Sequence, residues 1–146
     1  MVSIAKMHGA ANDFVVVEGA PPPSPRDAEW IRDVADRRRG VGADGVLFLE
    51  RLLDQEAVLR MHFYNCDGGR AGLCLNGARC VALRAVQLGW AEGRFRIATE
   101  HGALWAEVTS RDPRRGEVTL WIDPPPACGE ALVLPPGSVA EMGYAV

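Results

Sequence analysis

The chain has 146 residues, of which 48% are hydrophobic and 24% are charged, and its formal net charge is −3 at pH 7. This length is sufficient for one domain with a substantial core, and the composition is that of a globular protein. No basic block interleaved with aromatic residues is present, which argues against a nucleic-acid partner. No apolar stretch approaches the roughly 20 residues of a membrane helix and no leader cleavage signature is seen, so we expect a cytoplasmic protein without membrane association.

The cysteines of this chain do not suggest a disulfide framework or a metal centre. There are four of them, which is few for a chain of this length, and none forms a C-x-x-C pair. The three histidines are scattered along the sequence, without the spacing of zinc ligands. We therefore expect no bound metal and look to the cysteines for reactivity instead.

Strand-forming runs are distributed over the whole length. Residues 2–7 alternate apolar and polar side chains, residues 14–17 are rich in valine, and the turn-forming segment 8–13 lies between them. Similar runs predict further strands, the last three in hairpin order, at residues 46–49, 58–64, 95–99, 103–108 and 118–122.

A first helix is expected after the proline-rich stretch that ends near residue 25. Ser24 is suited to the N-cap and Pro25 to the first helical position. The run Arg37 to Arg39 is expected in its last turn, where cations complement the helix dipole, with Gly40 ending the helix. Residues 40–45 also match G-x-G-x-x-G, but a helix precedes and a strand follows them, the reverse of a dinucleotide site. We interpret this segment as a tight helix-to-strand turn.

A second helix is predicted over residues 78–88, with Gly89 as its stop. Only three polar residues interrupt this segment, so it is apolar on nearly every side, as buried helices are. Asn76-Gly77 is also a favoured hairpin-turn pair, but the helical spacing after it favours a helix start. These elements predict an α+β domain in which a mixed or antiparallel sheet curls around a buried central helix.

Cys74 lies where a glycine-rich loop meets this helix. A helix start has unpaired N–H groups and a partial positive charge, which favour a thiolate and can hold a carboxylate. The segment therefore predicts both a base and an anion site. An inert buried cysteine is the alternative, because free cysteine is among the most buried residue types. Cys80 is expected in the core, and Cys128, in the proline-rich tail, has no readable role.

Three motifs resemble the diaminopimelate epimerase family, and they occur in the family's order. They are residues 8–14 (His-Gly-Ala-Ala-Asn-Asp-Phe), Asp36-Arg37 followed by residues 40–45, and residues 64–68 with residues 74–80. The resemblance implies an isomerase that interconverts LL- and meso-diaminopimelate, in lysine and peptidoglycan precursor synthesis. It also implies a reaction that uses no pyridoxal phosphate, no metal and no other cofactor.

The same resemblance assigns the site residues. It implies that Cys74 is one of two catalytic cysteines, that Asn12 and Asn65 contact the substrate, and that the backbone of Leu75 and Asn76 meets the substrate α-carboxylate. One thiolate would take the Cα proton from one face while a second thiol returns a proton to the other. The family usually has glycine where Leu75 stands, which bears on how the substrate fits.

Residues 1–146 resemble the N-terminal domain of such an enzyme. The family supplies its second cysteine from a second, similarly folded domain, which this chain lacks, so we expect the chain alone to be inactive. A proline-racemase-like isomerase is one alternative, although that branch resembles Cys-Gly-His at the cysteine and Asn76 replaces the histidine here. A phenazine-pathway-like isomerase and a standalone binding or dimerisation domain are others; a two-fold homodimer could oppose two Cys74 side chains.

Overall fold

The computed structural model describes residues 3–21, 27–53, 57–110, 112 and 115–122. The elements, in chain order, are β1 (Ile4–Gly9), β2 (Asn12–Glu18), α1 (Asp27–Ala35), β3 (Gly45–Arg51), β4 (Leu59–Asn65), β5 (Arg70–Ala71), α2 (Leu75–Gln87), β6 (Arg94–Thr99), β7 (Gly102–Val108) and β8 (Val118–Trp121). Neither helix in these ranges is long and apolar enough to cross a membrane.

The strands form one curved mixed sheet in the order β1-β2-β3-β4-β6-β7-β8, with the short β5 paired to β4. The pairs β2–β3 and β4–β6 are parallel and the others are antiparallel. The α+β class and the mixed sheet are confirmed, and so is the hairpin order of the last three strands. The two parallel pairs each need a crossover, which α1 and α2 provide.

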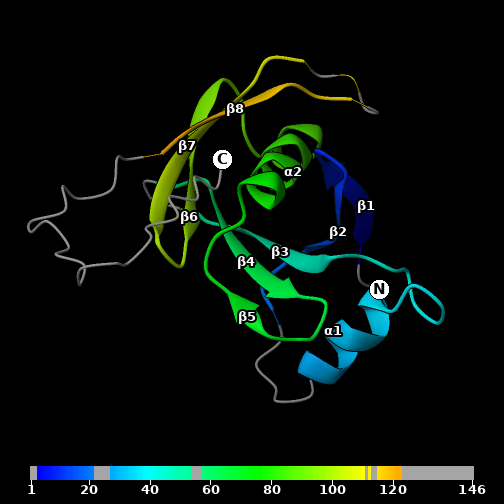
Figure 1. The fold of residues 1–146 in the computed structure, drawn as a ribbon. Coiled ribbons are helices and arrows are strands. Elements are labelled where there is room, and N and C mark those ends of the chain that lie inside the picture. The colour runs from blue at the N-terminus through cyan, green and yellow to red at the C-terminus, as the bar shows by residue number, and fades with distance from the viewer. Residues whose placement is uncertain (1–2, 22–26, 54–56, 111, 113–114, 123–146) are drawn as a thin grey trace, which may run out of the picture.

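The two helices lie on opposite faces of the sheet. In Figure 1 the sheet curls around α2, which contacts strands from β1 to β8, while α1 lies outside against β3. Because successive strand side chains point to opposite faces, β2 and β3 supply both cores. Phe14, Val16, Leu47 and Leu49 pack inward with α2, whereas Val15, Val17, Val46 and Phe48 pack outward with Ile31 of α1.

The predicted burial of α2 on nearly every side is not seen. Its buried residues are Gly77, Ala78, Cys80, Val81, Ala82 and Ala85. Leu83, Arg84 and Val86 are only partly buried and Gln87 is exposed. The reason is that β1 and β8 are the two ends of the sheet order, so the curl around α2 is open on one side.

The first turn is shorter than the sequence predicts. Residues 8–9 extend β1 and residues 12–13 begin β2, so that only Ala10 and Ala11 form the turn. Both have positive φ, at 52° and 65°, which is the backbone of a two-residue hairpin turn of type I′.

The first helix also ends earlier than predicted. It stops at Ala35, so Arg37 to Arg39 lie in the turn that follows it and not in its last turn. Ser24 and Pro25, predicted to begin the helix, lie outside the described residues. Residues 40–45 form the predicted helix-to-strand turn, with Gly42 at φ +76°.

Candidate active site

Strand direction brings several polar residues to one end of the sheet. Asn12 begins β2, Asp44 directly precedes β3, and Asn65 ends β4, which runs antiparallel to β3. Gly45 pairs with Asn65 on one side and with Phe14 on the other. Asn12 and Asn65, the predicted substrate contacts, therefore lie at the same end of β2 and β4, the two strands that flank β3. Asn65 is exposed there, and the adjacent amide of Cys66 donates to the Asp44 carbonyl at 3.1 Å.

Cys74 is the N-cap of α2, which agrees with its predicted place where the loop meets the helix, although the helix begins three residues earlier than predicted. Its backbone is extended (φ −134°, ψ 113°), and its half-buried sulfur accepts a hydrogen bond from the Gly77 N–H at 3.4 Å. The Ala78 N–H donates to the Cys74 carbonyl at 2.8 Å. In the described part of the chain no acceptor takes the N–H groups of Leu75 and Asn76. The helix start thus offers free donors beside a sulfur, a suitable setting for an anionic group.

Asn12 joins Cys74 to the first turn of α2. The Cys74 sulfur lies 3.7 Å from Asn12 Oδ1, and Asn76 Nδ2 donates to the same oxygen at 3.4 Å. On its other side Asn12 Nδ2 donates to Asp44 Oδ2 at 2.8 Å. Asn76 in turn accepts a hydrogen bond from Arg79 through its own Oδ1. Cys74, Asn12 and Asn76 are therefore brought together.

A charged network lies behind Asn12. Arg37 donates to both carboxyl oxygens of Asp13, at 2.7 and 3.0 Å, and to Asp44 Oδ1 at 2.7 Å. Lys6 adds a second ion pair to Asp13 at 2.7 Å. Hydrogen bonds from Arg37, and then from Lys6, hold the pKa of Asp13 well below its usual range. The carboxylates also accept each other's backbone N–H groups, each at 3.1 Å.

Sequence reasoning missed this network. It assigned Arg37 to a helix end, whereas the side chain reaches back to the β1–β2 hairpin. A usable signal was present, because Asp13 and Asp44 each directly precede a buried strand residue at the start of parallel strands. Two carboxylates at one sheet end require cations, and Arg37 lies in the connecting segment.

The other cysteines occupy different surroundings. Cys80 is 3% exposed, which confirms its predicted place in the core. Burial, and then the nearby Cys74, raise the pKa of the Cys80 thiol to about 12. Cys66 is exposed, and Cys128 lies outside the described residues. No group of three or more potential metal ligands occurs among the residues that the structure describes.

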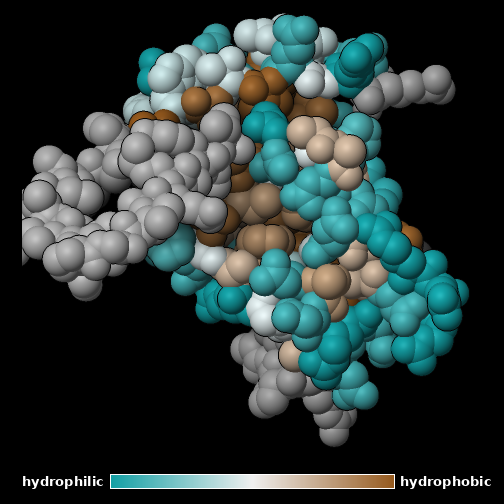
Figure 2. All heavy atoms as spheres, in the orientation of Figure 1, coloured by the Kyte–Doolittle hydropathy of each residue, from teal (hydrophilic) through white to brown (hydrophobic). Residues whose placement is uncertain are grey.

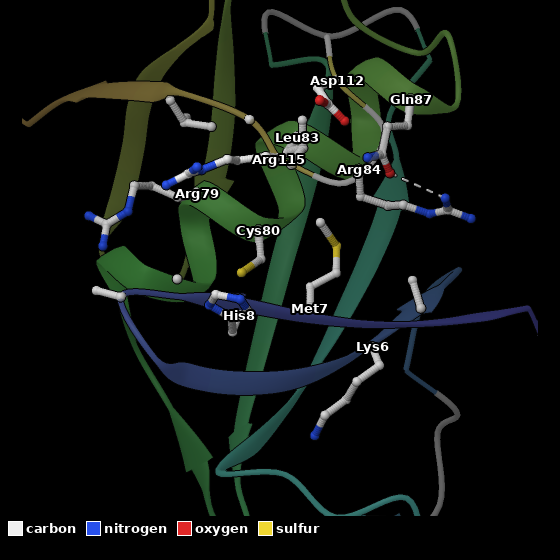
Figure 3. Close-up of a pocket in the computed structure, with 15 residues that line it drawn as sticks. Lys6, Met7, His8, Arg79, Cys80, Leu83, Arg84, Gln87, Asp112 and Arg115 are labelled. Carbon is white, nitrogen blue, oxygen red and sulfur yellow. Dashed lines mark hydrogen bonds between the residues drawn. The ribbon is translucent and has the colours of Figure 1, made fainter. Parts of the chain in front are cut away.

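A cavity of about 920 Å³ is lined by residues of β1 and α2 and by Asp112, Arg115, Gly116 and Val118. Figure 3 shows Cys80 and His8 on adjoining walls of this cavity, with Leu83 and Arg84 farther along α2. Cys74 is not among its lining residues, so this cavity and the helix start at Cys74 are separate features. In Figure 2 hydrophobic residues reach the surface in the middle of the face, where Figure 1 places α2 and the strands around it.

The sequence model of the family described as "Diaminopimelate epimerase" matches residues 4–121, which is most of the chain. The chain belongs to the diaminopimelate epimerase family. The matched residues include the whole arrangement of Asn12, Asp44 and Cys74 described above.

Two curated relatives illustrate the range of this family. The chain is 47% identical over 111 residues to a diaminopimelate epimerase of Xanthomonas euvesicatoria, covering 73% of this chain and 38% of that protein. It is 43% identical over 113 residues to an O-ureido-serine racemase of Streptomyces lavendulae, covering 75% of this chain and 38% of that protein. The chain thus spans about two fifths of the length of the curated relatives it matches.

Solved structures share the fold at low sequence identity. A hydroxyproline epimerase from Agrobacterium vitis, solved with trans-4-hydroxy-L-proline, superposes with a TM-score of 0.62 at 19% identity, over 82% of this chain and 40% of that one. A PhzF-family phenazine biosynthesis protein from Bacillus anthracis gives a TM-score of 0.57 at 16% identity, over 82% of this chain and 39% of that one. These likenesses show that the chain shares its fold with both proteins.

Proposed function

We propose that this chain is the N-terminal half of a cofactor-independent amino-acid epimerase that interconverts LL- and meso-diaminopimelate. The observation that carries the proposal is Cys74 at the start of α2, accepting the Gly77 N–H beside the free N–H groups of Leu75 and Asn76. Family membership and the diaminopimelate epimerase relatives support the choice of substrate. Lysine and peptidoglycan precursor synthesis in the cytoplasm is the setting that this function implies.

The mechanism is a proton exchange at the substrate Cα. The α-carboxylate would accept hydrogen bonds from the N–H groups of Leu75 and Asn76, which also stabilise charge that develops as the proton leaves. Cys74 would exchange a proton on one face of Cα, and Asn12 and Asn65 would contact the substrate. General acid–base catalysis of this kind typically contributes about 10²–10⁴-fold.

Inversion requires a second proton carrier on the opposite face. Cys66 and Cys80 are poorly suited to this role. Cys66 directly follows β4 in the same domain as Cys74, and Cys80 is buried in the core of that domain. We propose that the second cysteine comes from a second domain of the whole protein, with the substrate between the two. The 146-residue chain would then lack epimerase activity by itself.

A chimera tests the proposed function directly. The matched residues of this chain would replace the corresponding two fifths of the Xanthomonas euvesicatoria relative, and conversion of LL-diaminopimelate would be followed by NMR. We expect epimerase activity in the chimera and a loss of at least about 10²-fold with Cys74→Ser. The parent relative is the control for assay and assembly. A folded chimera that is inactive on this substrate would contradict the proposal.

A second experiment tests the need for another domain. The 146-residue chain is incubated with LL-diaminopimelate in deuterated water, and the products are separated by stereochemistry. We expect no meso product. Meso-diaminopimelate carrying solvent deuterium would refute the requirement for a second domain.

Racemisation of another amino acid is the second candidate. The observation that favours it is the 43% identity to an O-ureido-serine racemase. Leu75, at a position where the family resemblance implies glycine, points the same way. A leucine beside the substrate carboxylate leaves less room for a long side chain. The chimera would be assayed with O-ureido-L-serine in parallel. Preference for that substrate, relieved by Leu75→Gly, would favour this second function over the first.

A further inference from the structure

We propose that Asp44 sets the orientation of the Asn12 amide and thereby keeps Cys74 protonated at rest, which makes Asp44 a positioning residue for the proton exchange. In the whole enzyme, Cys74 would then be the proton donor of the resting form. The opposite thiolate takes the Cα proton, and Cys74 gives its S–H proton to the other face and becomes a thiolate. Only this last assignment rests on the proposed function.

The orientation of the Asn12 amide follows from its partners. A carboxylate can only accept hydrogen bonds, so the atom 2.8 Å from Asp44 Oδ2 must be the NH₂ group of Asn12. The carbonyl oxygen of Asn12 therefore faces the Cys74 sulfur at 3.7 Å. Asn76 agrees with this assignment, because its NH₂ group donates to the same oxygen at 3.4 Å.

The side-chain amide of Asn76 is oriented in the same way, by its contact with Arg79. A guanidinium can only donate, so Arg79 must bind the carbonyl oxygen of Asn76, which leaves the NH₂ group of Asn76 for Asn12. The two amides are thus aligned by charges of opposite sign, Asp44 at one end and Arg79 at the other. Neither amide can reverse without setting oxygen against oxygen or donor against donor.

Among the described residues that contact Asn12 Oδ1, only Cys74 can gain or lose a proton near neutral pH. Asn76 Nδ2 already donates to Asn12 Oδ1, and the second lone pair of this oxygen faces the sulfur. Cys74 can donate to that lone pair as a thiol, whereas a thiolate would be repelled by it. The Gly77 N–H can donate to either form and would stabilise the thiolate once it appears. The helix start alone predicts a resting thiolate; the Asn12 carbonyl opposes that prediction.

The charged and titratable groups around this sulfur come from three parts of the fold. Arg79 and the thiol of Cys80 lie on α2, and the Cys80 thiol interacts electrostatically with Cys74. Asp13 of β2 and Asp44 before β3 lie behind Asn12, and Arg37 bridges the two carboxylates. Since Arg37 takes Asp44 Oδ1 at 2.7 Å, Oδ2 is left for Asn12.

Asp44→Asn is the test. An asparagine at position 44 can accept or donate, so the Asn12 amide becomes free to present its NH₂ group to the sulfur. The full 146-residue chain is treated with iodoacetamide at pH 7, and the modification of each cysteine is followed by peptide mass spectrometry. We expect Cys74 to react about tenfold faster, the factor that corresponds to one hydrogen bond. The exposed Cys66 serves as the internal reference.

Asp36→Asn is the matched control. Asp36 pairs with Arg39 in the same connecting segment and accepts backbone N–H groups there, but it makes no contact with Asn12. We expect its Cys74 reactivity to equal that of the unchanged chain. An Asp44→Asn variant with an intact circular dichroism spectrum and unchanged Cys74 reactivity would overturn the proposal.

A readout without substitution covers the case in which Asp44→Asn does not fold. The ¹³Cβ resonance of Cys74 in cysteine-labelled chain distinguishes thiol from thiolate, and at pH 7 we expect the thiol. A thiolate resonance at this pH would overturn the proposal. Neither readout depends on epimerase activity, so a failure here is separate from a failure of the proposed function.

Discussion

A Cβ atom added at Gly9 would lie 2.7 Å from the carbonyl oxygen of Asn76. Gly9 ends β1 and Asn76 lies in the first turn of α2, so the missing side chain of Gly9 lets the β1–β2 hairpin close directly on the helix start. The contact is with backbone, which cannot rotate away as a side chain does. The approach of Asn12 to Cys74 depends on this close packing.

Gly9→Ala should therefore separate the hairpin from α2. We expect a loss of about 1–3 kcal/mol in the free energy of unfolding, because the overlap must be relieved by a backbone shift. Urea denaturation followed by circular dichroism measures this loss. Gly69→Ala is the control, because the added Cβ there meets only the flexible side chain of Asp67. Equal losses in the two variants would contradict the packing argument.

Ala11→Gly should stabilise the protein. Ala11 has a φ of 65°, a conformation that costs an L-residue roughly 1–2 kcal/mol and a glycine little. After the greater chain entropy of glycine is subtracted, we expect a gain of up to about 1 kcal/mol in the free energy of unfolding, measured with urea. Ala103→Gly, in β7, should be destabilising instead. A loss of stability with Ala11→Gly would show that the turn is not strained.

Stability should fall at alkaline pH because of Cys80. Its folded-state pKa is raised from 9.0 to about 12 by burial, so the folded state favours the neutral thiol. This contribution is fully present below pH 9 and is lost as the pH rises toward 12, at up to about 1.4 kcal/mol per pH unit. Between pH 9 and 10.5 we expect a loss of about 2 kcal/mol that Cys80→Ala lacks.

Urea denaturation in the presence of a reductant measures this difference. The slopes with pH are compared and not the absolute stabilities, since Cys80→Ala also leaves a cavity. Cys66→Ala, at an exposed position, should keep the alkaline loss. Parallel pH profiles for the unchanged chain and Cys80→Ala would exclude Cys80 as the cause.

Arg37→Gln tests the network behind Asn12. Arg37 lowers the pKa of Asp13 in the folded state. The stability that this carboxylate contributes is therefore present above pH 3.8, its ordinary pKa, and is lost as the pH falls toward its lower folded-state pKa. Arg37 is more than half exposed and solvent screens its ion pairs, so we expect only a small loss of stability at pH 7. The difference from the unchanged chain should shrink at pH 2 and in high salt. Arg38→Gln, in the same turn, is the control, and an equal effect there would rule out the specific pairing.

Local pattern was enough to predict most of the elements. The alternating and valine-rich runs marked the strands, and the helical spacing after Asn76 correctly favoured a helix start over a hairpin, with Gly89 at its end. Cys74 as the N-cap follows from the same boundary. These features depend on neighbours within a few residues, so the sequence alone carries them.

What escaped prediction depends on distant partners. Arg37 was assigned to a helix dipole because that interaction is local, but its strongest partner, Asp13, lies 24 residues away. The hydrogen bond between Cys74 and Asn12 spans 62 residues. The parallel pairing of β2 with β3 brings Asp13 and Asp44 together, and no short pattern encodes that pairing.

Asn12, whose carbonyl oxygen contacts the Cys74 sulfur, precedes it by 62 residues in the chain, whereas the Gly77 N–H that donates to the same sulfur follows it by three. Asn12, Asp44 and Asn65 all leave the ribosome before the thiol does. The acceptor for the Cys74 side chain is therefore already synthesised when the cysteine appears, and its N–H donor follows within one helical turn.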